Sequence, residues 1–427
     1  MLTLCLVLLP VMIVIGAPIA YVIGLPVTLI ILLTTQVPLK IVPQMMTAAV
    51  NSFPLMAIPF FLLAGNLMNI SGVTHRIFAF AQTLVGHIPG GLGHVSVVAS
   101  MIFAGMTGSA VAEAGGLGVV ELDAMKKRGY DVDFAAGIIV SAATIGPIIP
   151  PSVIFVLYGV LAEVSIGALF LAGFIPGILM GIALMVRVYF ISRKKQYPVT
   201  PRASALEVWQ AFRGAFLALL MPVIIIGGML GGVFTPTEAA VVAVLYAIVL
   251  GMGVYRQMTF GDVWQTLRLT GVQTAAVMLI TSTAVVLGWV LTRAQFSQAL
   301  TEYLLSITRN PYLILLLLNV FLLISGCFIE VIAALIIYTP VIVPLLKAVD
   351  IDPVHFGVVM TLNLMIGLLT PPFGMGLFVV QKIAQISFEQ MVRAALPFIL
   401  PLIVVLGLIT YVPWFCLWFP RLVLGTG

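Results

Sequence analysis

Apolar stretches long enough to cross a lipid bilayer recur along this chain of 427 residues. A membrane-spanning helix needs about 20 mainly apolar residues. Only 8% of the residues are charged and 62% are hydrophobic, whereas soluble domains are about 25% charged and disordered chains are polar. The sequence therefore predicts an all-α polytopic membrane protein whose solvent is the lipid bilayer.

Other functional classes find little support in the sequence. No basic run exceeds three residues, so the net charge of +5 does not indicate nucleic-acid binding. The three cysteines, Cys5, Cys327 and Cys416, lack a CxxC spacing, and the histidines lack a metal-ligand spacing. Hydrolase, zinc-protease, P-loop and dinucleotide-binding motifs do not occur in a credible context. We predict a protein that is not an enzyme and binds neither an organic cofactor nor a transition metal.

Two Pro-Pro pairs in apolar surroundings reveal an internal repeat. They are Pro150-Pro151 in GPIIPPS and Pro371-Pro372 in GLLTPPF, 221 positions apart. The same offset pairs further glycines, prolines and charges, which mark backbone geometry better than apolar residues do. These pairs are Gly105 with Gly326, Lys126 with Lys347, Gly146 with Gly367, and Pro176 with Pro397. The chain reads as two repeats, 1–200 and 214–427, joined by a cytoplasmic linker at 201–213.

Each repeat is expected to hold five spans and one re-entrant hairpin. The hairpins are predicted at about 91–126 and 311–347, because each is too short for two crossings and has a Gly-containing tip. Segments 73–88 and 292–309 resemble interfacial arms. The N-terminus has no positively charged segment or cleavage site, so it is interpreted as a first span and not as a signal peptide. The expected spans are 2–20, 21–36, 54–72, 134–160 (broken) and 164–190, then 215–233, 236–254, 272–291, 354–381 (broken) and 388–414.

An odd number of spans per repeat would insert the second repeat upside down. If the loop 187–213 is cytoplasmic, fourteen of the nineteen Lys and Arg residues lie inside, Lys126 among them, whereas Lys347 lies outside. That bias agrees with the positive-inside rule. Parallel repeats, the alternative, would spread basic loops over both faces.

The two proline breaks are the places where backbone groups become available inside the membrane. Prolines remove N–H donors and obstruct the carbonyl four residues earlier, and unpaired backbone at that depth must face protein or a wet cavity. Paired broken helices opposite hairpin tips are the arrangement that secondary transporters use for ions and substrates. The carbonyls expected to point at a cation are those around Thr144, Ile145, Gly146 and Ile149, and around Met365, Gly367, Leu368 and Thr370.

Neutral side-chain oxygens cluster near the same positions and would suit Na⁺. They belong to Thr107, Ser109, Ser141, Thr144, Ser325, Thr361, Asn363 and Thr370. The alternative is that these hydroxyls only bond back to their own helix.

Three acidic residues stand out near membrane segments. Glu113 and Glu330 lie on the predicted hairpins, where an acid is a functional candidate. Glu330 is the nearer of the two to a tip and is left open between a cation or proton site and a structural carboxylate that locks the tip. Glu238 falls in the first turn of a helix, where it would complement the helix dipole.

Three segments carry a resemblance to a known family. The run GMTGSAVAEAGGLGVVELDAMKKRGYDVDFAAGIIVSAATIGPIIPPSVIFVLYGVLAEVSIG at 105–167, FTPTEAA at 234–240 and IDPVHFGVVMTLNLMIGLLTPPFGMGLFV at 351–379 resemble the large membrane (M) subunit of tripartite ATP-independent periplasmic (TRAP) transporters. The resemblance extends over essentially the whole chain. Thr107 stands where the family is associated with Ser, and the hydroxyl is kept.

The resemblance implies an elevator-type transporter, with a scaffold and a moving transport domain, in a bacterial inner membrane. Such a protein couples uptake of an organic anion, a carboxylate or sugar acid, to two or more Na⁺ ions. It works with a periplasmic substrate-binding protein and a small four-helix membrane subunit, expected here as a separate chain. The resemblance places cation site one at Gly105, Thr107, Ser109, Gly146 and Ile149, and cation site two at Ser325, Gly326, Gly367 and Thr370. The substrate candidates are Ser109, Ser141, Thr361 and Asn363.

Three rival functions remain at this point. A stand-alone sodium:anion symporter of the same architecture would work without a binding protein. A channel would conduct without saturating or needing Na⁺, and a purely structural subunit would not need two matched sites.

Overall fold

The computed structural model of the protein describes residues 8, 11–12, 15–34, 37–372 and 374–425, and all regular elements in those ranges are helical. The first expected span, 2–20, lies largely outside them. In the first half the helices are α2 (Ile19–Thr34), α3 (Ile41–Val50), η1 (Phe53–Met56), α4 (Ala57–Ile70), α5 (Val73–Val85), α6 (Gly91–Thr107), α7 (Ala110–Lys127), α8 (Val132–Ala143), α9 (Val153–Ala162) and α10 (Ile166–Lys195).

The second half contains the same kinds of element in a similar order. They are α11 (Ala205–Leu230), α12 (Pro236–Ile248) with the π-helical turn η2 (Val249–Val254), α13 (Phe260–Arg293), α14 (Phe296–Ile307), α15 (Pro311–Gly326), α16 (Val331–Ala348), α17 (Pro353–Gly367), α18 (Met375–Ala384), α19 (Phe388–Tyr411) and α20 (Trp414–Leu424). Both expected hairpins (α6–α7 and α15–α16) and both broken helices (α8–α9 and α17–α18) are present as pairs of helices.

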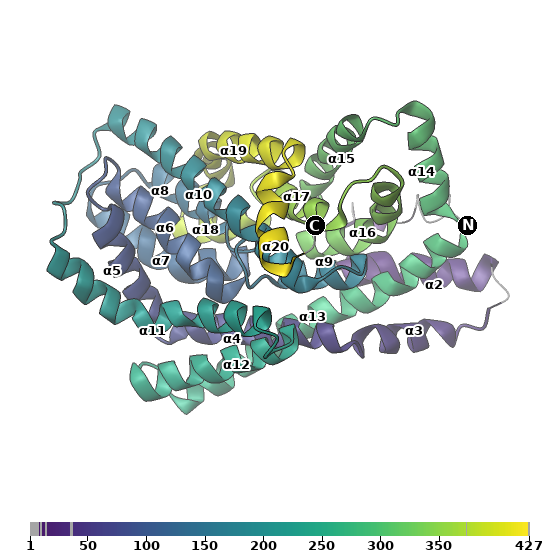
Figure 1. The fold of residues 1–427 in the computed structure, drawn as a ribbon, viewed down its shortest axis with the longest axis horizontal. Coiled ribbons are helices and arrows are strands. Elements are labelled where there is room, and N and C mark those ends of the chain that lie inside the picture. Colours follow the sequence, from purple (N-terminus) through teal and green to yellow (C-terminus); the bar gives the residue numbers. More distant parts are fainter. Residues whose placement is uncertain (1–7, 9–10, 13–14, 35–36, 373, 426–427) are drawn as a thin grey trace.

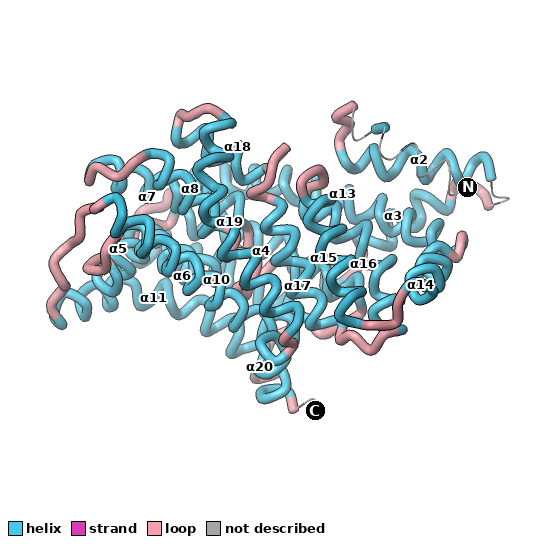
Figure 2. Tube along the Cα trace, turned by 90° about the horizontal axis from the view of Figure 1, so that it is seen from above, coloured by secondary structure: helices cyan, strands magenta, loops and turns pink. Residues whose placement is uncertain are grey.

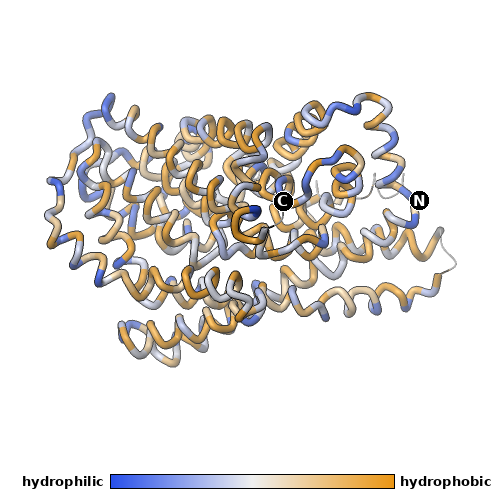
Figure 3. Tube along the Cα trace, viewed as in Figure 1, coloured by the Kyte–Doolittle hydropathy of each residue, from blue (hydrophilic) through white to orange (hydrophobic). Residues whose placement is uncertain are grey.

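Seven helices of the described chain are long and apolar enough to cross a membrane. Six correspond to expected spans, and the seventh is the hairpin helix α16. Apart from span 2–20, the remaining expected spans fall below that length because α2 has 16 residues and the proline breaks divide the other two. Figure 3 shows apolar residues along most helices, with hydrophilic ones concentrated in the connections.

Several helix boundaries differ from the expected ones. Helix α11 begins at Ala205, inside the expected linker 201–213, and α13 begins at Phe260 instead of 272. Each start is set by a capping box, in which a Ser or Thr and the acid three residues later satisfy each other's backbone N–H. Helices α3 and α20 were not expected. Pro413 separates α20 from α19.

The helices form a layer and a body beside it (Figure 1). Helices α3, α4, α11, α12 and α13 lie along the lower edge of that view, and the hairpins and broken helices lie above them. Figures 1 and 2 both place α6 and α7 toward one end of the molecule and α15 and α16 toward the other, with α17 between them. We call α2–α4 and α11–α13 the scaffold layer, and α6–α10 with α15–α19 the core body.

The core body is interlocked across the two halves of the chain. Hairpin helix α7 packs against α8 of its own half and α18 of the other half, and α16 packs likewise against α17 and α9. The long helices cross in the same way, α19 onto α8 and α10 onto α17. Such exchanged contacts make the core body one packed unit, whereas it meets the scaffold layer mainly through α6, α9 and α16, with smaller contacts from α7 and α10.

Candidate functional site

The tip of hairpin one is a tight turn between two buried helix ends. Helix α6 ends at Thr107, and Gly108 follows with φ 58°, a left-handed conformation that favours glycine. The Ser109 side chain accepts a hydrogen bond from the backbone N–H of Ala112 at 3.4 Å and so caps α7. The Thr107 hydroxyl is buried and has no hydrogen-bond partner among the described residues.

The first break, residues 144–152, leaves carbonyl groups without partners. It contains a cis peptide bond between Pro150 and Pro151. Ser152 caps α9 and donates to the Pro147 carbonyl at 2.6 Å. The Ile145 carbonyl accepts backbone hydrogen bonds from two residues of the break. Within the described chain the carbonyls of Thr144, Gly146 and Ile149 accept none.

Tip one lies directly against break one. An ideal Cβ placed on Gly108 would lie 2.6 Å from the Pro151 carbonyl oxygen, and one on Gly105 would lie 3.6 Å from that of Pro150. On its other side the tip touches the scaffold layer. A Cβ on Gly65 of α4 would lie 2.9 Å from the Thr107 Cα, and the Cβ on Gly105 would lie 2.7 Å from Pro222 of α11.

Tip two also lies directly against break two. A Cβ on Gly367 would lie 2.7 Å from both the carbonyl carbon and oxygen of Gly326, a separation that real Cβ atoms do not show. The break again contains a cis bond, between Pro371 and Pro372. The structure therefore brings together the glycines expected at site two, backbone against backbone.

The polar groups around break two are only partly available. The Ser325 hydroxyl donates to the Leu322 carbonyl at 3.2 Å and that of Thr370 to Ile366 at 2.8 Å, so both bond back to their own helices. The carbonyls of Gly367 and Thr370 accept backbone hydrogen bonds. Those of Met365 and Leu368 accept none in the part of the chain that the structure describes.

Glu330 is a helix cap in this structure. Its carboxylate accepts a hydrogen bond from the backbone N–H of Ala333 at 3.1 Å, at the start of α16. Ser109 and Ala112 make the equivalent contact in hairpin one, at the repeat offset of 221. Of the two roles left open for Glu330, the observed contact is the one expected of a structural carboxylate that locks the tip. Glu238 also caps, closing a capping box with Thr235.

Three of the four substrate candidates, Ser141, Thr361 and Asn363, are buried in this conformation, and Ser109 is partly buried. Ser141 has a partnerless hydroxyl in the described chain, and Thr361 donates back to the Gly357 carbonyl at 2.8 Å. The Asn363 amide donates to both the side-chain oxygen and the carbonyl of Asn319 on α15, at 2.8 and 3.0 Å. Sequence reasoning missed Asn319, although an amide in the middle of an otherwise apolar helix is a recognisable signal. It joins hairpin two to the broken helix.

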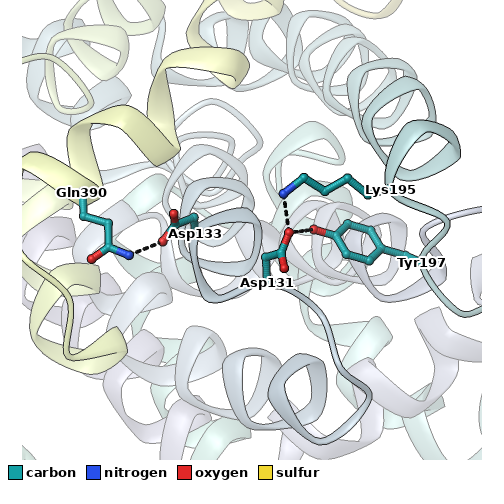
Figure 4. A network of polar contacts seen from close by, with 5 residues as sticks. All are labelled: Asp131, Asp133, Lys195, Tyr197 and Gln390. Carbon is teal, nitrogen blue, oxygen red and sulfur yellow. Dashed lines mark hydrogen bonds and ion pairs between the residues drawn. The ribbon is translucent and has the colours of Figure 1, made fainter.

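Hydrogen bonds and one ion pair hold the helix ends together at the base of hairpin one (Figure 4). Asp131, before α8, accepts hydrogen bonds from Lys195 at the end of α10 and from the Tyr197 hydroxyl, while Asp133 accepts from Gln390 of α19. The Lys195 ammonium and the Tyr197 hydroxyl lower the pKa of Asp131 below its ordinary value of 3.8. These contacts fix α8, which carries break one, to both long helices of the core body.

We call each contact between a hairpin tip and its broken helix a tip–break junction: junction one joins tip one to break one, and junction two joins tip two to break two. The oxygens at both junctions are suitable ligands for a hard monovalent cation. The junctions offer carbonyls without donors and, at junction one, buried hydroxyls, and hard cations prefer such oxygen ligands. No group of three or more His, Cys, Asp or Glu side chains that could hold a metal ion occurs among the described residues.

Comparison with a family model agrees with the resemblance in the sequence. Residues 6–415 match the model of the DctM component of the tripartite ATP-independent periplasmic transporter. The chain is 50% identical over 396 residues to the sialic acid TRAP transporter large permease protein SiaM of Vibrio cholerae, covering 93% of each. It is 40% identical over 361 residues to the C4-dicarboxylate TRAP transporter large permease protein DctM of Pseudomonas aeruginosa, covering 84% of each.

Another relative is longer than this chain. The sialic acid TRAP transporter permease protein SiaT of Haemophilus influenzae is 42% identical over 380 residues, which are 88% of this chain and 61% of SiaT. Among solved structures, the YdaH transporter of Alcanivorax borkumensis aligns with a TM-score of 0.65 over 98% of both chains at 16% identity. That similarity shows a shared fold.

Proposed function

The chain belongs to the DctM family of TRAP transporter large permeases, and we propose that it drives uptake of an organic anion with a Na⁺ gradient. It is a multi-pass protein of the bacterial inner membrane. Its relatives are named as permeases, which fits a role other than catalysis.

The observation that carries the proposal is the pair of tip–break junctions. Each hairpin tip lies against a proline-broken helix, and each break presents backbone carbonyls that accept no hydrogen bond from the described residues. Inside a membrane such groups cost on the order of several kcal/mol each unless something binds them. Sodium ions at the two junctions would satisfy these oxygens and would order both tips beside the anion.

The substrate class follows from the chemistry and from the relatives. Bound cations at the two hairpin tips create local positive charge, which favours an anion. The relatives named above are permeases for sialic acid and for C4-dicarboxylates, both carboxylates. We therefore expect a carboxylate or sugar acid, delivered by a periplasmic binding protein, with a small membrane subunit bracing the scaffold layer. SiaT is longer than this chain, which matches only 61% of it, so the relatives differ in which segments share one chain with the large permease.

An elevator motion is the mechanism that fits this packing. The core body is interlocked by exchanged contacts between its halves, so it would move as one unit. It meets the scaffold layer at close contacts, such as those of Gly65 with Thr107 and of Gly105 with Pro222. Inverted repeats would give each hairpin access to a different side of the membrane.

Uptake of candidate carboxylates into proteoliposomes tests the proposal. We expect saturable uptake that requires an inward Na⁺ gradient and the binding protein, and Ser109→Ala should abolish it while membrane insertion stays intact. The carboxylate panel should include a sialic acid and a C4-dicarboxylate.

The controls separate the alternatives. Uptake that is unchanged without the binding protein would favour a stand-alone sodium:anion symporter of the same architecture. Conduction that neither saturates nor needs Na⁺ would indicate a channel, and normal uptake by Ser109→Ala would contradict the site assignment.

A further inference from the structure

The two tip–break junctions are not chemically equivalent. At junction two, the Gly367 backbone is met by the backbone of Gly326. At the equivalent place in junction one, an ideal Cβ on Gly146 would lie 2.6 Å from a carboxylate oxygen of Glu113. The residue that corresponds to Glu113 at the repeat offset is Ala334, which is fully buried and apolar. Junction one therefore has an acid at a position where junction two has an alanine, whereas the acid of tip two, Glu330, caps α16.

Glu113 is fully buried without hydrogen bonds of normal geometry. Its side chain is 1% exposed, and neither carboxylate oxygen has a hydrogen-bond partner among the described residues, although the neutral hydroxyl of Ser100 lies beside it. An unpartnered carboxylate is among the most unfavourable groups to bury. Either a bound cation or a proton must therefore neutralise it.

Helix capping does not account for this carboxylate. Glu113 lies in the first turn of α7, where the helix dipole favours an acid. However, Ser109 already accepts the hydrogen bond from Ala112, and the carboxylate of Glu113 bonds to no backbone N–H of the described chain. It differs in this respect from Glu330 and Glu238, whose carboxylates accept backbone hydrogen bonds.

Protein cations do not account for it either. The helices packed against α7 are α4, α5, α6, α8 and α18. Their Lys and Arg residues are Arg76 of α5, which stacks over the Tyr255 ring, and Lys382 in the last turn of α18. Neither forms an ion pair with Glu113 in the described structure.

The surroundings of the carboxylate are those of a cation site. Gly146 itself has a carbonyl that accepts no hydrogen bond from the described residues, as do Thr144 and Ile149. The hydroxyls of Thr107 and Ser141, on helices adjoining α7, are buried and equally without described partners. Acceptor oxygens thus gather at junction one without donors of the protein's own.

We propose that Glu113 is the anionic ligand of the cation site at junction one, so that this site binds Na⁺ more tightly than the site at junction two, where the carboxylate of Glu330 is used to cap α16. The inference rests on the proposed function, because it assumes that Na⁺ is the ion bound. In a low-dielectric interior a full negative charge contributes far more to cation binding than carbonyl dipoles do. The two sites then fill in a fixed order, junction one first.

Direct binding of radioactive sodium to the purified protein in nanodiscs tests this inference. Wild-type protein should show two classes of site, and Glu113→Gln should lose the tighter class, with affinity lower by roughly ten- to hundredfold. Glu121→Gln is the matched control. Glu121 is on the same helix and also 1% exposed, but it accepts a hydrogen bond from Ser96 at 2.6 Å. Its variant should bind Na⁺ within about twofold of wild type.

Thermal unfolding gives a second readout that does not depend on transport. Without Na⁺, Glu113→Gln should unfold at or above the wild-type temperature, because an unneutralised buried charge is removed, and Na⁺ should stabilise it less than wild type. Wild-type affinity in Glu113→Gln, or an equal loss in Glu121→Gln, would overturn the assignment of Glu113. Absence of Na⁺ binding in wild type would instead overturn the proposed function.

Discussion

At the scale of single residues, Gly367 marks a close backbone-to-backbone approach between hairpin tip two and its broken helix. A methyl group there would lie 2.7 Å from the Gly326 backbone, which cannot move aside as a flexible side chain can. We expect Gly367→Ala and Gly367→Leu to reduce Na⁺-driven uptake to background. The overpacking costs about 1–3 kcal/mol, so the variants should still insert, as judged by the amount of folded protein recovered from membranes.

Gly407→Ala provides the comparison for this substitution. Gly407 also lies in an apolar helix, α19, but a Cβ there meets no atom within 4 Å. Its uptake should equal that of wild type. If Gly367→Ala transports normally, junction two does not need the close backbone contact and its role as a site is contradicted.

The sequence located the glycines of the junctions better than it located the hydroxyls. The family resemblance placed Gly326 and Gly367 in one site, and they are in contact. The hydroxyls of Thr361 and Thr370 were expected as ligands, but both donate to the carbonyl four residues earlier. Every helix offers that acceptor, so residue type and position alone do not reveal which way a hydroxyl turns.

At the scale of elements, the breaks were predicted within a few residues because prolines act locally. The expected broken spans 134–160 and 354–381 correspond to 132–162 and 353–384 in the structure. Helix α3 was missed because its ten residues, which include Pro43 and Gln44, do not reach membrane length. Helix α11 was placed too late, since apolar length reveals the membrane portion and not the polar first turns. The Ser204 to Glu207 capping box was the available signal.

The ion pair between Asp131, at the start of α8, and Lys195 of α10 should make the stability of the protein depend on pH. The pKa of Asp131 is lowered in the folded protein. The ion pair therefore stabilises the folded state fully above the ordinary pKa of 3.8, and this stabilisation is lost as the pH falls through the lower pKa of the folded protein. Both side chains are half exposed, so the pair contributes at most about 1 kcal/mol. Asp131→Asn should lower the unfolding temperature at pH 7, and the difference from wild type should vanish in acid.

Unfolding of both proteins in detergent between pH 7 and pH 3 is the measurement. Asp123→Asn is a suitable control, because Asp123 pairs with Lys127 one turn along its own helix and joins no two elements. A difference between Asp131→Asn and wild type that stayed constant into acid would mean that the charge of Asp131 is not what stabilises this junction.

At the scale of the whole molecule, the two halves exchange equivalent contacts. Helices α7 and α18 pack together as α16 and α9 do, and α8 packs on α19 as α17 packs on α10. A pairwise exchange of this kind is what a two-fold axis between repeats produces. The repeat offset in the sequence predicts which elements correspond. It could not anticipate the exchange, since contacts between distant helices leave no local pattern in an apolar sequence.

The orientation of the repeats can be tested at two equivalent lysines. Lys126 and Lys347 lie 221 positions apart, near the ends of α7 and α16, and both are exposed. If the repeats are inverted, as the distribution of Lys and Arg predicts, the two residues lie on opposite faces of the membrane. In a background without Cys5, Cys327 and Cys416, a membrane-impermeant maleimide added to spheroplasts should label Lys347→Cys at once. Lys126→Cys should react only after the membrane is permeabilised. Equal labelling of both positions before permeabilisation would make the repeats parallel, and opposite-facing hairpins could then no longer serve as the two gates of an elevator.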